Sequence, residues 1–187
     1  MENSFEGFVK RVVSALNKSM VNYVIIGGIA AIIYGRPRTT MDIDVIIDLK
    51  ASEKEKIENL VAIFSKFNLN VTAEEIVDAL IEGSHFSVFD KLSPFRIDAK
   101  GINTKLDQIA IKNRRKITLF GLKTWIEAPE DLIVAKLIYG SPQDIEDALS
   151  VIINMKDELD IDYLTKRAQE ENVYNMLTKI FRKTKEI

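Results

Sequence analysis

The stretch that most constrains this chain begins with a short apolar run, residues 23–26, which leads directly into the pair Gly27-Gly28. A second apolar run follows at residues 29–34. The first run is rich in β-branched residues and is typical of a buried strand. The two glycines let the backbone turn sharply and let a ligand approach it closely. We therefore predict a strand, a tight turn and a short helix that opens at Gly28, where unpaired N–H groups would form an anion site.

Two aspartates follow on the next predicted strand. Asp42 and Asp44 are two positions apart, so on a strand both carboxylates point to one face, while Ile43 points to the other, into a core. Neighbouring carboxylates repel each other unless a cation lies between them. A phosphate-binding turn beside this pair suggests Mg²⁺ bound to nucleotide phosphates. The structural alternatives are that the glycine pair is only a turn and that the aspartates only mark a strand end that reaches solvent.

The composition is that of an ordinary globular protein. The chain has 187 residues, of which 47% are hydrophobic and 29% charged, which is enough for one domain with a real core. Its net charge of −2 provides no global field for nucleic acid, so a polyanion site must be a local patch. The absence of cysteine excludes disulfides, thiolate metal sites and a cysteine nucleophile. We find no signal-peptide pattern and no apolar run long enough to span a membrane, so we expect no membrane partner and a cytoplasmic location.

The periodicity of the whole chain predicts an α/β (α+β) fold. With caps included, the predicted helices cover residues 5–17, 52–67, 72–83, 106–111, 129–140, 141–152, 160–170 and 173–181. The predicted strands cover residues 23–26, 42–47, 85–89, 95–100, 117–120 and 122–126. Capping boxes are predicted for Ser52 with Glu55, Thr72 with Glu75, and Ser141 with Asp144. We predict a core at residues 1–127 and a helical C-terminal part, residues 128–187, packed on it.

The order of these features resembles the nucleotidyltransferase superfamily of the polymerase β type. Within it, the chain looks most like the minimal bacterial and archaeal nucleotidyltransferases, including the AbiEii-like toxin group. Members carry Gly-Gly or Gly-Ser, a helix, Asp-x-Asp on the next strand and a third carboxylate on a later strand. The resemblance covers roughly residues 20–155. It implies a mixed β-sheet flanked by helices, and an enzyme that moves a nucleoside monophosphate from an NTP such as ATP to an acceptor hydroxyl with Mg²⁺ or Mn²⁺.

The resemblance assigns roles to the residues that match the first motifs. Asp42, Asp44 and Asp98 would be the catalytic, metal-binding carboxylates, and Gly27 and Gly28 would hold the β- and γ-phosphates. Two metal ions need more anionic oxygens than one Asp-x-Asp provides, which is the reason for a third carboxylate. From the residues alone, Asp98 is also compatible with an exposed Arg-Asp-Lys ladder along its strand.

A later segment, residues 129–149, resembles another block of the family. Lys136 matches a lysine that meets nucleotide phosphates, and Asp144 and Asp147 match an acidic pair. The alternative is a surface ion pair between Lys136 and Asp147 on adjacent helices, which would contribute little. Arg36, Arg38 or Lys136 could neutralise the leaving pyrophosphate.

The chain departs from the family pattern at two positions. Many relatives have serine after the first glycine, whereas Gly28 offers only its backbone to a phosphate. Gln143 stands where the family usually has a basic residue. The first departure could weaken the binding of an NTP or could simply be the Gly-Gly variant found in part of the family, and the second could remove phosphate contacts at that position.

The residues do not specify the acceptor. Toxin-like relatives suggest a tRNA end or a protein as acceptor, with an antitoxin-like partner, and antibiotic-modifying relatives suggest a small molecule. Two other classes stay open: a nucleotidyltransferase-fold module that binds or regulates without turnover, and an RNA-binding protein that uses Arg36, Arg38 and the basic run at residues 112–116. We interpret that run as a solvated surface, and His85 as a strand-end residue.

Overall fold

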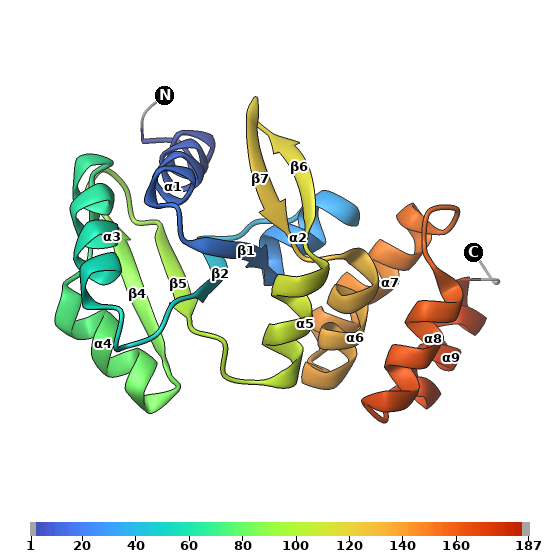
Figure 1. Cartoon of the computed structure of the whole chain (residues 1–187). Helices are drawn as coiled ribbons and strands as arrows, with labels where there is room; N and C mark the ends of the chain where they lie inside the picture. Colours follow the sequence, from blue (N-terminus) through green and yellow to red (C-terminus); the bar gives the residue numbers. More distant parts are fainter. Residues whose placement is uncertain (1–2, 185–187) are drawn as a thin grey trace.

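A computed structural model defines residues 3–184, and residues 1–2 and 185–187 lie outside the described residues. The strands of the described part are β1 (Asn22–Ile26), β2 (Asp42–Asp48), β3 (Leu69–Asn70), β4 (His85–Asp90), β5 (Arg96–Lys100), β6 (Arg115–Leu119) and β7 (Leu122–Ile126). Within these residues they form one mixed sheet in the order β3-β4-β5-β2-β1-β7-β6 (Figure 1). The helices of the described part are α1 (Phe5–Ser19), α2 (Gly27–Tyr34), α3 (Lys54–Lys66), α4 (Ala73–Glu82), α5 (Lys105–Asn113), α6 (Pro129–Tyr139), α7 (Pro142–Met155), α8 (Ile161–Glu170) and α9 (Tyr174–Thr184). The predicted class, a mixed sheet flanked by helices, is confirmed.

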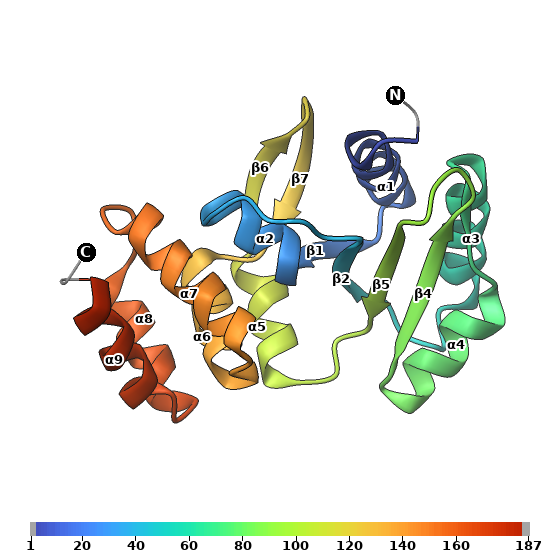
Figure 2. The same ribbon diagram turned by 180° about the vertical axis from the view of Figure 1, so that it is seen from behind.

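The molecule extends from α3 and α4 at one end to α8 and α9 at the other, and the β6–β7 hairpin projects from the middle (Figure 1). Seen from behind, α2 lies beside α6 and α7 (Figure 2), in agreement with its contacts to both helices and to β2. None of the helices formed by the described residues has the length and apolar character needed to cross a membrane.

The centre of the sheet fixes the relative positions of the acidic residues. β2 pairs antiparallel with β1 and parallel with β5, and in the second pairing Asp44 lies opposite Asp98. As predicted, Ile43 is fully buried, while Asp42 and Asp44 on the opposite face are only partly buried. The alternation of side chains along a strand therefore brings carboxylates from two neighbouring strands to the same face of the sheet.

Local capping signals predicted two of three helix starts correctly. Thr72 at α4 and Ser141 at α7 each form a complete capping box. The predicted box at Ser52 is wrong, because the N-cap of α3 is Glu53 and no side chain caps that helix. The Glu53 carboxylate instead accepts a hydrogen bond from the backbone N–H of Lys50 at 2.9 Å, so the chain turns one residue later than the pattern indicated.

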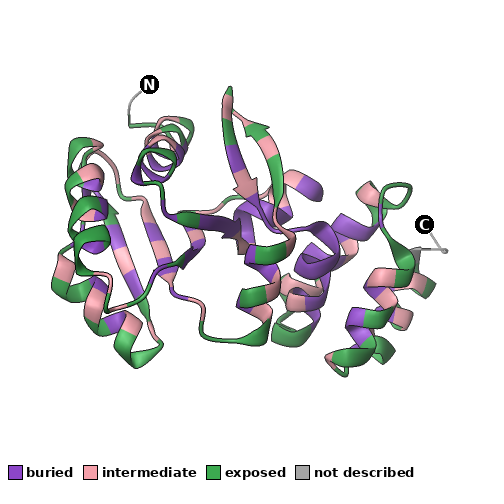
Figure 3. Cartoon of the chain, in the orientation of Figure 1, coloured by how far each residue is buried: buried purple, intermediate pink, exposed green. Residues whose placement is uncertain are grey.

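Two large apolar clusters and a small one hold residues 3–184 together. Figure 3 colours the buried residues of the chain purple. The first joins α1, α3 and α4 to the sheet and includes Phe8 and Leu60, both fully buried. The second joins α2 to the helices α6–α9 and includes Ile133 and Leu164. The small cluster lies under α5. Because α2 begins at the glycine turn and packs against α6 and α7, the second cluster fixes the turn relative to those two helices.

Candidate functional site

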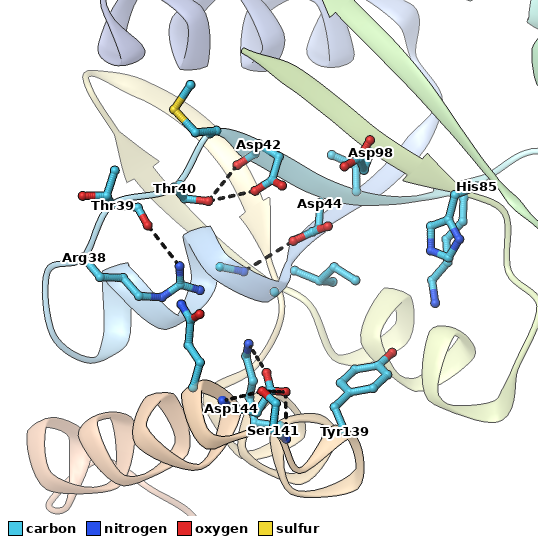
Figure 4. A pocket seen from close by; sticks show the side chains of 18 residues that line it. Arg38, Thr39, Thr40, Asp42, Asp44, His85, Asp98, Tyr139, Ser141 and Asp144 are labelled. Carbon is cyan, nitrogen blue, oxygen red and sulfur yellow. Dashed lines mark hydrogen bonds and ion pairs between the residues drawn. The ribbon is translucent and has the colours of Figure 1, made fainter. Parts of the chain in front are cut away.

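The predicted site residues converge on one cleft of about 560 Å³ between the ends of β1, β2 and β5 and the α6–α7 junction (Figure 4). Its lining includes the following residues assigned above to catalysis or nucleotide binding: Gly27, Gly28, Arg38, Asp42, Asp44, Asp98 and Lys136. Residues separated by more than a hundred positions in the sequence thus share one surface. The roles given to them stay predictions.

The glycine turn is packed tightly against two of these residues. Gly27 has a φ of +62°, and a Cβ atom built there would lie 2.4 Å from Asp44 Oδ2. Both the left-handed backbone and the close approach therefore require glycine at this position. A Cβ at Gly28 would lie 3.0 Å from Arg38 Nη2 and 3.4 Å from Thr40 Oγ1. The start of α2 thus lies between a carboxylate and a guanidinium.

Asp42 and Asp44 on β2 and Asp98 on β5 form one side of the cleft, the strand wall, and their carboxylates repel one another. The Gly28 N–H lies 3.5 Å from Asp44 Oδ2, a long hydrogen bond. Burial raises the pKa of the Asp44 carboxyl, and the negative charges of Asp42 and Asp98 raise it further, while the Gly28 N–H and Lys136 offset this only in part. Asp44 is therefore a carboxylate whose charge the surrounding protein compensates poorly.

Arg96 lies between the other two carboxylates. Its Nε donates to Asp98 at 2.9 Å, and its Nη2 lies 3.6 Å from Asp42. Asp98 also accepts a hydrogen bond from Ser87 Oγ at 2.7 Å. The Arg–Asp part of the ladder foreseen for β5 is thus present, and it lies at the cleft.

The strand wall has the donor chemistry of a site for a hard divalent cation, since Mg²⁺ and Mn²⁺ prefer carboxylate oxygens. Among residues 3–184, no three histidine, cysteine, aspartate or glutamate side chains are grouped closely enough to hold a metal ion. Asp42 and Asp44 fit such an ion, because no cationic side chain of the described residues forms an ion pair with Asp44. Asp98 would join them only after Arg96 released it.

The opposite side of the cleft, the helix wall, is formed by Lys136 on α6, by Asp144 on α7 and by Arg38, which pairs with Asp147 of α7. The cations of this wall are already paired. Lys136 Nζ lies 2.8 Å from Asp144 Oδ1 and 3.0 Å from Asp147 Oδ2. Burial alone would lower the pKa of the Lys136 ammonium, but its hydrogen bonds to the two carboxylates outweigh this effect and raise it. The predicted pair of Lys136 with Asp147 exists, but the expectation that it lies on the surface is wrong, because these residues are 9% and 1% exposed.

Of the two arginines considered, Arg38 lines the cleft and Arg36 does not. Arg36 pairs instead with Glu146 on the exposed face of α7, so this structure gives it no part in neutralising a leaving group. Gln143 faces Arg38, and in the amide orientation that satisfies both side chains its oxygen accepts from Arg38 Nη1 at 3.0 Å. The glutamine that replaces a basic residue thus supports Arg38.

Sequence reasoning missed Glu127, which follows β7 directly and lines a small cavity of about 50 Å³ beside Gly27. This residue is 6% exposed. Burial raises the pKa of its carboxyl to about 8, repulsion from Asp131 adds to the effect, and Lys136 opposes it. A glutamate directly after an apolar strand was the only available signal, and it did not reveal the burial.

The basic run at residues 112–116 is divided among several contacts. Arg114 lies over the ring of Trp125, 4.8 Å from its centroid, and Arg115 pairs with buried Glu130 at 2.9 Å. These two residues therefore have structural partners, whereas Lys112 is exposed. His85 is exposed at the start of β4, as expected of a strand-end residue, and it also lines one end of the cleft.

Comparison with protein families matches residues 112–186 to a family described as nucleotidyltransferase of unknown function (DUF6036). This match covers less than half of the chain; it includes Lys136 and the acidic residues of α7 but not the glycine turn or the strand wall. No curated protein matches the sequence.

Comparison with solved structures matches almost the whole chain. The antibiotic-resistance factor ANT(2'')-Ia, solved in solution, is 16% identical with a TM-score of 0.60, over 97% of this chain and 99% of that one. The same enzyme in complex with adenylyl-2''-tobramycin is 15% identical with a TM-score of 0.60, over 89% and 96% of the two chains. An antigenic nucleotidyltransferase-like protein from Paracoccidioides brasiliensis is 17% identical with a TM-score of 0.59, over 95% and 91%. At these identities the likeness shows the fold, which is that of nucleotidyltransferases, while the finer resemblance to AbiEii-like toxins stays a prediction.

Proposed function

We propose that this protein is a nucleotidyltransferase that moves a nucleoside monophosphate from an NTP to an acceptor hydroxyl with the help of Mg²⁺ or Mn²⁺. The observation that carries the proposal is the cleft itself. One wall presents Asp42, Asp44 and Asp98, the other presents cations, and a glycine turn lies between them. Such a surface suits a polyanion that brings its own divalent cation, because each wall then meets a charge of opposite sign.

The chain's own groups would bind the triphosphate from two sides. Gly27 has no side chain that would hinder a phosphate at the backbone of the turn. Arg38 and Lys136 present positive charge to the same cleft and would stabilise the charge of the departing pyrophosphate. Catalysis would then consist mainly of positioning and charge neutralisation.

Asp42, Asp44 and Asp98 would hold the metal, which when bound neutralises phosphate charge and makes the acceptor hydroxyl easier to deprotonate. Asp98 would leave Arg96 in the process. Freed from that pair, its carboxylate would orient the acceptor hydroxyl and accept a hydrogen bond from it.

The acceptor is the open part of the proposal. The complex of ANT(2'')-Ia with adenylyl-2''-tobramycin supports testing ATP as donor and a small polyhydroxylated molecule as acceptor. A tRNA end or a protein as acceptor, and an antitoxin-like partner, are further hypotheses that rest on the family resemblance alone.

A second function, a nucleotide-binding or regulatory module without turnover, is favoured by one observation. Arg96 already supplies positive charge to Asp42 and Asp98, where an active enzyme needs a metal ion. If Arg96 remains in place when nucleotide binds, the protein would bind nucleotide without catalysing its transfer.

The test is transfer of label from α-³²P-labelled NTPs in the presence of Mg²⁺ or Mn²⁺, with total RNA, cell protein and aminoglycosides offered as separate acceptors. The control is the double variant Asp42→Asn/Asp44→Asn. Label on one acceptor class with the wild type alone supports the enzyme and identifies its substrate. Binding of the nucleotide without any transfer favours the module, and the absence of both binding and transfer overturns the proposal.

A further inference from the structure

Asp147 on α7 joins the two cations of the helix wall. We propose that Asp147 is a positioning residue that holds Arg38 and Lys136 in place and thereby sets the affinity of the cleft for the triphosphate of the nucleotide. This inference rests on the proposed function and assigns a role to a residue that does not itself line the cleft.

Both oxygens of the Asp147 carboxylate are used. Oδ1 accepts from Arg38 Nε at 3.1 Å, and Oδ2 lies 3.2 Å from Arg38 Nη2 and 3.0 Å from Lys136 Nζ. The two-point contact with the guanidinium fixes its plane as well as its position. One buried carboxylate therefore orients a cation from the loop before β2 and a cation from α6.

The position of Arg38 is fixed from a second side by the glycine turn. The Nη2 atom that meets Asp147 lies where a side chain at Gly28 would be, 3.0 Å from the position of its Cβ. Glycine at this position thus leaves room for the guanidinium at the start of α2. Gly28 has no side chain that could contact a phosphate. Arg38 would make that contact instead, as long as Asp147 holds its guanidinium beside Gly28. A cation held in place in advance loses less entropy when the ligand binds.

The same loop and helix provide a matched control. Arg36 and Glu146 also form an ion pair between the loop before β2 and α7, but their side chains are 52% and 60% exposed and neither lines the cleft. A role of Asp147 that consisted only of attaching the loop to the helix would be shared by Glu146. A role in positioning the phosphate-binding cations would belong to Asp147 alone.

The experiment measures the dissociation constant of ATP in the presence of Mg²⁺ by calorimetry for the wild type, Asp147→Asn and Glu146→Gln, with GTP, CTP and UTP in parallel. Loss of a charged hydrogen-bonding partner is expected to weaken nucleotide binding about tenfold to a hundredfold in Asp147→Asn. Glu146→Gln should bind within about twofold of the wild type. In the transfer assay, the KM for the nucleotide should rise in Asp147→Asn more than kcat falls.

A double variant separates positioning from folding. Because Asp147 acts partly through Arg38, Asp147→Asn should weaken nucleotide binding less in the Arg38→Gln background than in the wild type, and the remaining loss reports the share exerted through Lys136. Should Asp147→Asn fail to fold, Asp147→Glu keeps the charge and is expected to show intermediate affinity. Wild-type affinity in the folded Asp147→Asn or Asp147→Glu protein, or equal weakening in Glu146→Gln, overturns this inference and leaves the proposed function standing. A wild type that binds no NTP refutes the proposed function, and this inference with it.

Discussion

The two walls of the cleft carry similar numbers of charges but differ in how those charges are compensated. On the strand wall, the described residues give Asp44 only a long hydrogen bond from Gly28, and burial together with the charges of Asp42 and Asp98 raises the pKa of its carboxyl. On the helix wall, Lys136 is held by Asp144 and Asp147 within 3.0 Å. The strand wall would gain stability from an added cation, whereas the helix wall is stable as it is and already positioned to receive an anion. Removing a charge should therefore have opposite effects on the stability of the two walls.

The largest effect is expected from Asp44→Asn. Loss of this carboxylate, which we propose binds the metal, should lower the rate of transfer on the order of 10³-fold. The metal-free protein should nevertheless melt at a higher temperature, because the amide removes a charge whose raised pKa shows that the fold disfavours it. Label transfer and thermal melting at neutral pH in the absence of divalent ions measure the two effects.

The control for that prediction is Asp48→Asn, which changes the same chemistry on the same strand at an exposed position outside the cleft. Both its activity and its melting temperature should stay close to the wild type. A lower melting temperature for Asp44→Asn would contradict the proposed difference between the walls.

On the helix wall, Lys136→Met should destabilise the protein. The substitution leaves two carboxylates without their shared cation, and breaking a buried pair costs roughly 3 kcal/mol. Urea denaturation measures the loss, and Lys56→Met, which breaks an exposed pair with Glu53, should cost less than about 0.5 kcal/mol. Equal stability of the two variants would show that the helix wall is not preorganised.

The turn between the walls can be tested with Gly27→Ala. A non-glycine residue at φ +62° and a Cβ 2.4 Å from Asp44 should together destabilise the protein by about 1–3 kcal/mol. Gly121→Ala is the matched control, since Gly121 has a φ of +84° and nothing within 4 Å of its Cβ position. Denaturation should show the larger loss for Gly27→Ala, and equal losses would mean that the contact with Asp44 carries no cost.

The effect that depends on pH concerns Glu127, behind the cleft. The pKa of its carboxyl is raised to about 8 in the folded protein, above that of an unfolded glutamate. Between these two pKa values, the Glu127 carboxyl is protonated in the folded state and ionised in the unfolded state. The contribution of Glu127 to the free energy of unfolding therefore falls as pH rises through this range and is constant above the higher pKa. The slope approaches about 1.4 kcal/mol per pH unit.

Glu127→Gln should remove that slope and should be more stable than the wild type near pH 8. Chemical denaturation between pH 5 and pH 9 measures the difference, with exposed Glu58→Gln as the control. Parallel curves for the wild type and Glu127→Gln would show that the carboxyl does not change its proton binding on folding.

Features that depend on near neighbours in the sequence were predictable. The period of two residues placed Asp42 and Asp44 on one face, and the capping boxes at Thr72 and Ser141 depend on residues only three positions apart. Ser52 shows the limit of such signals, because the adjacent Glu53 bonded the backbone in its place. The types of the predicted strands and helices followed from the same local patterns, whereas the two-residue strand β3 was not predicted.

Features that depend on tertiary contacts were not predictable. Arg38 and Lys136, the two cations that pair with Asp147, lie on the loop before β2 and on α6. No spacing in the sequence could therefore reveal that they share a partner. The burial of Glu127 follows from the packing of the end of β1, α5 and α6 around it. Arg96 and Asp98 were expected to share a face, but only the register with β2 brings Asp42 within reach of the same arginine.

The most direct test of the account is a calorimetric titration of ATP into the wild type and into Asp44→Asn, each with Mg²⁺ and with EDTA. The account predicts binding to the wild type that is stronger with Mg²⁺ than with EDTA, and no such enhancement by Mg²⁺ in Asp44→Asn. Absence of binding to the wild type under both conditions, or the same gain from Mg²⁺ in both proteins, would contradict the assignment of the cleft as a metal-assisted nucleotide site.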